Sequence, residues 1–356
     1  MLKIKKQINT LYLSSVLGNL SITGAWVAIL AARGFSLVEI GFAETIFHAT
    51  SLICEIPSGV LADRLGRKRI LIVSQVSFIL ACLVMALTEN FAGVCISFMF
   101  NAIGWNCQSG SGDALAYDSL KVCGEESRYE RYASNQLLIF RIGSGISTLC
   151  AGIALVLGYR IAYLLSVINH AITLVVLLSL KEVETGEKAE NVFQHSLDSI
   201  RFLFHYKKTS ALMFANGIVG AIDTLLLFFL QSKLRTAGIS DWALGLALFA
   251  MELGGIVGGR LILRAKNVRY YVIFTVCTAV VILGVILEHP DVILLMTLGG
   301  FLAAAADDAL QVRTNAKLQD MFPSEQRATL ISVNEFIFSV IMIILSPIAG
   351  YFFTLW

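Results

Sequence analysis

The stretch GVLADRLGRKR, residues 59–69, follows one long apolar segment and precedes another. Its single acid, Asp63, stands among four basic residues: Arg64, Arg67, Lys68 and Arg69. Gly59 would let a second helix approach closely, and Gly66 permits a tight turn between two helices. An acid held at such a turn can cap the N-terminus of a neighbouring helix. The stretch therefore predicts a short, charged connection between helices that can hold another helix and release it.

The composition places the chain in the membrane class. Of its 356 residues, 57% are hydrophobic and only 15% are charged, whereas soluble domains carry about 25% charged residues. The net charge of +2 leaves no excess of positive charge for binding nucleic acid. The seven cysteines form no C-x-x-C pair and have no histidine at metal-binding spacing. We interpret them as apolar packing residues and expect no metal site.

Eleven segments are long and apolar enough to cross a bilayer as helices. A crossing takes about 20 residues, because every backbone polar group must be bonded within the segment. The expected spans are 8–32, 37–62, 70–88, 91–119, 134–157, 161–180, 210–231, 241–263, 270–287, 292–316 and 328–354. The prediction is an all-α membrane protein with about eleven transmembrane helices.

The positions of Lys and Arg predict the orientation, because cytoplasmic loops are enriched in them. Nearly all of the 27 lie in the alternate loops that include the N-terminus, or at the adjoining helix ends. The exceptions are Arg33, Arg160, Lys233 and Arg235 on the opposite side and Arg141 within a span. We therefore expect a multi-pass protein of the bacterial inner (cytoplasmic) membrane with a cytoplasmic N-terminus.

The longest loop divides the spans into six before it and five after it. Its later part places Phe193, Leu197, Ile200 and Phe204 on one helical face, which predicts an amphipathic helix at the membrane surface. The expected domains are an N-terminal six-helix bundle (1–180), a cytoplasmic linker (181–209) and a C-terminal bundle of five helices (210–356). Many transporters are built from two equal halves. We therefore expect a twelfth helix to be absent from this chain.

Residues 59–69 resemble the signature of the major facilitator superfamily, G-x-L-a-D-r-x-G-r-k-x. The matching positions are Gly59, Leu61, Asp63, Arg64, Gly66, Arg67 and Lys68. The resemblance implies two pseudo-symmetric helical bundles that work by alternating access, with this loop as a latch in the outward-open state. It also implies that Arg67 pairs with Asp118 at the inner end of the fourth helix, and that the latch closes on residues 327–329. A basic loop that only sets topology is the alternative, which would leave the glycines and the acid without a reason.

Polar residues near the middle of the predicted spans are candidates for a solute pathway, because such residues are costly in lipid without a cavity or a partner. They are Asn19, Asn101, Trp105, Asn106, Asp223, Glu252, Asp307 and Asp308. In the fold that the resemblance implies, the first, fourth, seventh and tenth helices line a central cavity. All of these residues except Glu252 fall on those helices, so the other seven are the cavity candidates. A carboxylate there can carry a proton between the two faces, so Asp223, Asp307 and Asp308 are the candidates for proton coupling. Structural pairing of each acid with a polar neighbour is the alternative.

Three further residues receive plainer interpretations. Arg141, within the fifth span, is predicted to neutralise Asp113 or Asp118 of the fourth, with an anionic solute as the alternative partner. His48 and His170 are isolated on apolar helices and are interpreted as packing residues.

These features predict a secondary active transporter that moves a small solute with protons. We expect a monomer in the lipid bilayer with no cofactor, catalytic residue or metal, which exports amphipathic compounds or drugs. Drug exporters of the family often carry an Arg in the fourth helix and a Pro in the fifth, and the absence of both here weakens that direction. A proton-coupled importer of a sugar, nutrient or peptide is the first alternative. A non-transporting membrane sensor or an enzyme is the second, although no enzyme motif supports it.

Overall fold

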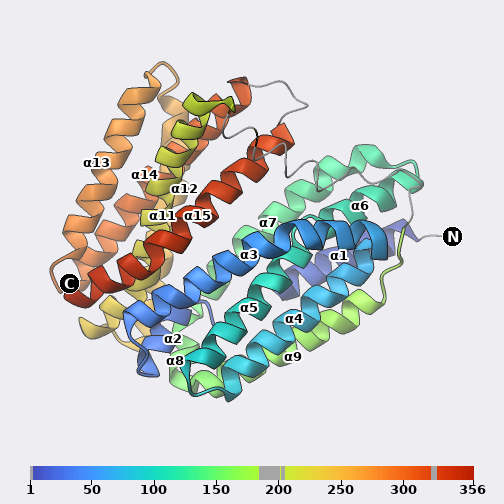
Figure 1. Ribbon diagram of the computed structural model, residues 1–356, viewed down its shortest axis with the longest axis horizontal. Helices are drawn as coiled ribbons and strands as arrows, with labels where there is room; N and C mark the ends of the chain where they lie inside the picture. Colours follow the sequence, from blue (N-terminus) through green and yellow to red (C-terminus); the bar gives the residue numbers. More distant parts are fainter. Residues whose placement is uncertain (1–2, 184–200, 202–204, 322–326) are drawn as a thin grey trace. The chain divides into compact units, whose positions relative to one another are not determined.

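The computed structural model describes residues 3–183, 201, 205–321 and 327–356, without the side chains of Ile56, Asp63, Gln319, Asp320 and residues 327–332. Every regular element in this part of the chain is helical (Figure 1). The predicted all-α fold is therefore confirmed. The amphipathic helix expected within 181–209 falls on residues outside the described part.

The chain forms two compact units, which we describe one at a time. The first unit comprises residues 1–24 and 46–193, and the second comprises residues 25–45 and 194–356. The helices of the first unit are α1 (Ile4–Asn19), the larger part of α3 (Leu37–Leu65), α4 (Arg67–Leu87), α5 (Phe91–Gln108), α6 (Ser111–Val122), α7 (Tyr129–Leu149), α8 (Ala151–Leu157) and α9 (Tyr159–Leu178), with the 3₁₀ turn η1 (Glu126–Arg128). Those of the second unit are α2 (Trp26–Ala32), the start of α3, α11 (Lys207–Thr236), α12 (Asp241–Leu261), α13 (Tyr270–Glu288), α14 (Ile293–Met321) and α15 (Arg327–Leu355), with the 3₁₀ turn η2 (Ile262–Arg264).

Residues 25–45 belong to the second unit although they lie early in the chain. The backbone N–H of Val27 donates to Gln231 Oε1 of α11 at 3.1 Å. Gly41 of α3 packs so closely on α15 that an added β-carbon would lie 2.8 Å from the α-carbon of Pro347. In this grouping, residues 25–45 are separated from the rest of residues 1–180, the range predicted for the N-terminal bundle.

Among the described residues, eight helices are long and apolar enough to span a membrane. The pair α7 and α8, bent by 41°, makes a ninth if it counts as one span. All eleven predicted segments contain helix, but three are broken: the first at residues 20–25, the fourth at residues 109–110 and the fifth at Cys150. Gly110 has a φ of +72°, a left-handed conformation that commonly ends a helix. Hydropathy did not show these breaks, because it measures apolar length and not continuity.

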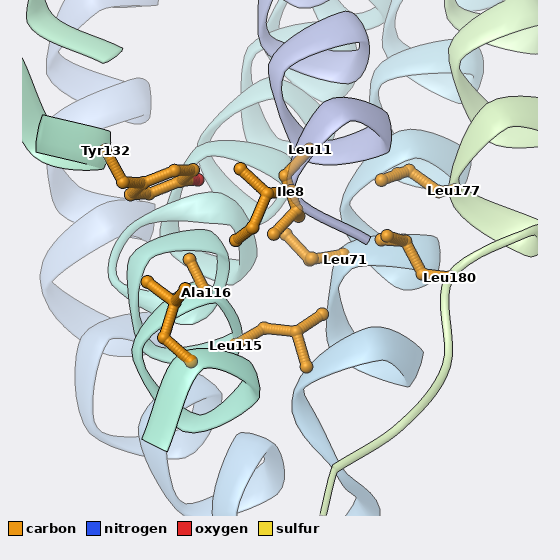
Figure 2. Packing of buried hydrophobic residues seen from close by; sticks show 9 residues of the cluster. Ile8, Leu11, Leu71, Leu115, Ala116, Tyr132, Leu177 and Leu180 are labelled. Atoms are coloured by element: carbon orange, nitrogen blue, oxygen red, sulfur yellow. The ribbon is translucent and has the colours of Figure 1, made fainter. Parts of the chain in front are cut away.

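One buried apolar cluster holds together the helices of the first unit near the motif stretch. It contains Ile8, Leu11, Leu71, Leu115, Ala116, Leu120, Tyr132, Leu177 and Leu180. Figure 2 shows the labelled side chains converging from α1, α4, α6, α7 and the end of α9. In a bilayer this packing stabilises through van der Waals contact, because lipid tails are as apolar as leucine. Since Leu71 follows Arg67 by one helical turn, the cluster fixes the start of α4.

Small residues bring the helices of the second unit into close contact around α14. An added methyl at Gly254 or Gly258 of α12 would meet the backbone carbonyls of Phe301 and Ala305. On α13, a β-carbon at Gly284 would lie 2.8 Å from the carbonyl oxygen of Gly299. Small residues four positions apart allow membrane helices to approach this closely. In Figure 1, α13 runs beside α14, with which it is in extensive contact.

Candidate functional site

The motif stretch of residues 59–69 forms the end of α3, a one-residue turn and the start of α4. Gly66 makes the turn with a φ of +97°, and a side chain there would collide with the carboxylate of Glu182. Glu182 accepts from the backbone N–H of Lys68, at 3.0 Å to Oε2 and 3.3 Å to Oε1. The ammonium of Lys68 donates to the carbonyl of Leu178 at 2.9 Å. The acid thus caps the N-terminus of α4, where negative charge is favourable.

Arg67 joins the motif stretch to α6. Its Nε lies 2.9 Å from Oδ2 of Asp118, a residue that is 7% exposed. The neighbouring Ser119 accepts from the amide of Gln7 of α1, which also donates to the carbonyl of Lys181 at 2.7 Å. The pair that the resemblance implied is therefore present, within a polar cluster of the first unit.

The other residues of the expected latch lie at the end of α3 or outside the described part of the structure. Gly59 is half-buried on α3, and Arg64 is exposed at its end. The side chain of Asp63 and those of residues 327–329 lie outside the described part of the structure. The function of this loop as a latch stays a prediction.

The polar candidates of the first unit lie on two helices. Asn101 and Trp105 are both exposed on one face of α5, and Trp105 is 53% exposed. Asn106 is turned toward α3, where its amide donates to Ser51 Oγ at 2.9 Å. Asn19 is the last residue of α1 and donates to the carbonyl of Ser15 at 2.7 Å. Among the described residues, no hydrogen bond joins Asn19 to the α5 candidates.

The three acidic candidates are brought together in the second unit. Asp223 of α11 interacts electrostatically with Asp307 and Asp308 of α14. The helices approach at Gly220, where a β-carbon would lie 3.5 Å from Asp307 Oδ1. Asp223 is buried, and its Oδ1 has no hydrogen-bond partner among the described residues. Asp308 faces α12, where only a glycine, Gly255, leaves room for its carboxylate.

A chain of hydrogen bonds extends from Asp307 along α14. Gln311 Nε2 donates to Asp307 Oδ1 at 3.2 Å, and Gln311 Oε1 accepts from Asn216 Nδ2 at 2.7 Å. Thr314 then donates to Asn216 Oδ1 at 2.9 Å, and the hydroxyl of Tyr270 lies 2.8 Å from that of Thr314. This series of hydrogen bonds satisfies buried polar groups and orients the Asp307 carboxylate. Its i, i+4, i+7 spacing on α14 was a sequence signal that could have revealed Gln311 and Thr314.

Glu288 is a buried acid that the sequence analysis missed. It is 0% exposed at the end of α13, and both of its carboxylate oxygens lack a hydrogen-bond partner in the described part of the chain. Lys233 of α11 interacts with it electrostatically. The Lys233 ammonium donates to the carbonyl of His289 at 3.0 Å and lies 4.5 Å from the ring centroid of Trp356. Both charges stand at span ends in the sequence, which is where exposed residues are expected.

The remaining sequence candidates have plainer surroundings. Arg141 and Asp113 are both exposed, and within the described residues no ion pair joins Arg141 to Asp113 or Asp118. The neutralisation predicted for Arg141 is therefore not seen in this part of the chain. His170 lies 3.0 Å from Gln75 Oε1 through Nδ1 and stacks on Phe78, in keeping with a packing residue.

A multi-pass helical chain with two compact units and interacting acids inside one of them has the features of a membrane transporter. The sequence model of the Major Facilitator Superfamily matches residues 9–347, and the chain belongs to this family. The resemblance carried by residues 59–69 is thereby confirmed. The family consists of transporters and not of enzymes, and its members take small molecules as substrates.

The relatives are distant. The chain is 26% identical over 256 residues to YxaM, an uncharacterized MFS-type transporter of Bacillus subtilis (strain 168), an alignment that covers 69% of this chain and 61% of that protein. Among solved structures it resembles a mutant of the nucleoside transporter NupG, with a TM-score of 0.76 and 14% identity over 97% of this chain and 91% of that one. It also resembles a D-xylose-proton symporter, with a TM-score of 0.69 and 13% identity over 97% and 89% of the two chains. At these identities the solved structures support the fold alone.

Proposed function

We propose that the chain is a proton-coupled transporter that moves a small organic solute across a bacterial cytoplasmic membrane by alternating access. The observation that supports this most is the electrostatic interaction of the buried Asp223 with Asp307 and Asp308 inside the second unit. In this proposal they lie on helices that border the solute pathway, and the N-terminus is cytoplasmic. A small solute and protons are the partners, and the protein acts as a monomer.

The unpartnered oxygen of Asp223 favours this acid as the proton carrier. A buried carboxylate oxygen without a hydrogen bond is costly unless a proton or a ligand neutralises it. Asp307 differs, because Gln311 donates to its Oδ1 and the hydrogen-bond chain behind Gln311 holds that amide in place. The two acids therefore have separate tasks in the proposal: Asp223 takes up and releases the proton, and Asp307 is a fixed acceptor beside it.

We propose export of amphipathic compounds as the direction of transport. Trp105 supports this, because its exposed ring on α5 offers a flat surface for a planar or apolar solute. Import of a polar solute is the second candidate. It is favoured by the uncharged polar groups of the first unit and by the likeness to a nucleoside transporter and a D-xylose-proton symporter.

Proteoliposomes containing the purified protein and a pH-sensitive dye in their lumen would test both parts. Uridine, D-xylose or ethidium would be added on one side of the membrane without an imposed pH gradient, and the lumenal pH would be followed. A pH change that requires the protein and one of these solutes supports proton coupling. Its sign separates symport from antiport. Solute movement without any pH change would contradict the proposal.

A further inference from the structure

The first span contains an unwound segment, residues 20–25, between α1 and α2. Its residues up to Gly24 belong to the first unit. Counted along α1 from Ile8, the segment begins about 17 Å into a hydrocarbon core that is about 30 Å thick. Non-helical backbone at this depth is tolerated only where it is buried in protein or lines a water-filled cavity.

Two polar side chains from other helices form hydrogen bonds with the backbone at the end of α1. Ser147 of α7 accepts from the backbone N–H of Ser21 and donates to the carbonyl of Asn19, both at 2.9 Å. Asn169 of α9 donates to the carbonyls of Leu17 at 2.9 Å and Leu20 at 3.1 Å. These bonds replace the helical ones that the last turn of α1 lacks. The break is thus built into the unit by residues distant in sequence.

The bonding stops where the unwound segment continues. The next four carbonyl oxygens, those of residues 21–24, accept no hydrogen bond from the described residues. Asn19 Oδ1 is likewise without a donor in that part of the chain, because only the Nδ2 of this side chain is bonded. Ser21 and Thr23 add two hydroxyl groups 2.9 Å apart. The segment therefore presents a group of hydrogen-bond acceptors and two hydroxyls without a charged side chain of its own.

We propose that the unwound segment of residues 19–24 is a binding site for an uncharged, hydroxyl-bearing part of the transported solute. The proposal rests on the proposed transport function and names the solute class. Carbonyl oxygens left without a donor can accept hydrogen bonds from hydroxyl or amide groups of a solute, and an acceptor-rich site discriminates strongly against a solute without donors. Ser147 and Asn169 are positioning residues, because they bond the backbone at the start of the segment and leave the carbonyls of residues 21–24 without a donor among the described residues.

Cysteine labelling of the otherwise native protein in membranes tests the site. Thr23→Cys is expected to react with a membrane-impermeant methanethiosulfonate, whereas Leu11→Cys, in the buried apolar cluster of the first unit, is expected not to react. The parent protein, with its own cysteines, provides the background. Saturating D-xylose or uridine should slow the reaction of the Thr23→Cys variant by about tenfold.

The matched variants Ser147→Ala and Ser144→Ala, one turn apart on α7, separate positioning from general damage. Ser147→Ala should remove most of the protection by D-xylose and uridine, and Ser144→Ala should keep it. Size-exclusion profiles show whether each variant is folded. If Ser147→Ala does not fold, the labelling and protection of Thr23→Cys decide alone.

Three results would overturn the inference. Thr23→Cys could be unreactive, neither D-xylose nor uridine could slow its labelling, or sodium ions could slow the labelling while neither solute does. The last would indicate a cation site made of the same oxygens. The labelling needs no proton gradient. The site can therefore hold while proton coupling fails, and proton coupling can hold while the site fails.

Discussion

Arg67 of α4 forms an ion pair with Asp118 of α6, with 2.9 Å between Nε and Oδ2. The arginine is partly exposed and the acid is almost buried. The pair ties the connection between two spans to α6, the second half of the broken fourth span. In the proposed transport cycle, the pair keeps α4 and α6 in a fixed relation within the first unit.

Asp118→Asn should slow transport by about tenfold, which corresponds to about 1.4 kcal/mol in the barrier. The amide keeps the size of the side chain but leaves Arg67 without its anion. Glu130→Gln, at an exposed acid on α7, is the control and should transport at the parental rate. Initial rates in proteoliposomes measure the effect. A parental rate for Asp118→Asn would show that the pair has no part in the cycle.

Asp63→Asn should also insert normally and slow transport severely, since the motif loses its anion without losing its size. Membrane levels of the protein and initial rates of transport measure the two expectations separately. A variant that transports at the parental rate would reduce the motif stretch to a determinant of topology.

Gly258 and Gly259 of α12 provide an adjacent test of helix packing. A methyl at Gly258 meets the backbone carbonyl of Ala305, whereas the nearest atom to a methyl at Gly259 is a side-chain carbon of Val312 at 3.9 Å. Gly258→Ala should therefore destabilise the second unit by about 2 kcal/mol. Gly259→Ala should be neutral or slightly stabilising, because alanine favours helix. Thermal unfolding in detergent compares them, and equal stability of the two variants would contradict the close contact of α12 with α14.

Lys233 and Glu288 should show strong coupling in a double-mutant cycle. Lys233→Met leaves a buried carboxylate without its compensating charge and should cost roughly 3 kcal/mol. Adding Glu288→Gln should recover most of that loss, since no uncompensated charge then remains. Unfolding midpoints of the two single variants and the double variant measure the coupling. Strictly additive losses would mean that the two charges do not interact.

The all-helical membrane fold could be predicted from apolar segments of about 20 residues, because bilayer thickness requires that length. The pairing of Arg67 with Asp118 could be predicted only through the family resemblance. It joins two helices whose registers the sequence does not relate. The acids of α11 and α14 could be singled out because a charge in the middle of an apolar run is costly.

Other features lay beyond sequence reasoning for identifiable reasons. Glu288 ends an apolar run, where a charge ordinarily reaches water, and its burial follows from the close contact of α13 with α14. The unwound segment depends on Ser147 and Asn169, which lie more than a hundred residues away in the chain. Common polar residues such as these carry no signal until the fold brings them to the end of α1.

Transport by Asp223→Asn decides whether Asp223 carries the coupled proton. Uptake driven by a pH gradient and gradient-free exchange of the same radiolabelled solute would be measured in one proteoliposome preparation, with Asp291→Asn in an exposed loop as the control. We predict that Asp223→Asn loses driven transport but retains exchange, because exchange needs no net proton movement, and that Asp291→Asn retains both. Driven transport at the parental rate in Asp223→Asn would show that Asp223 does not carry the coupled proton.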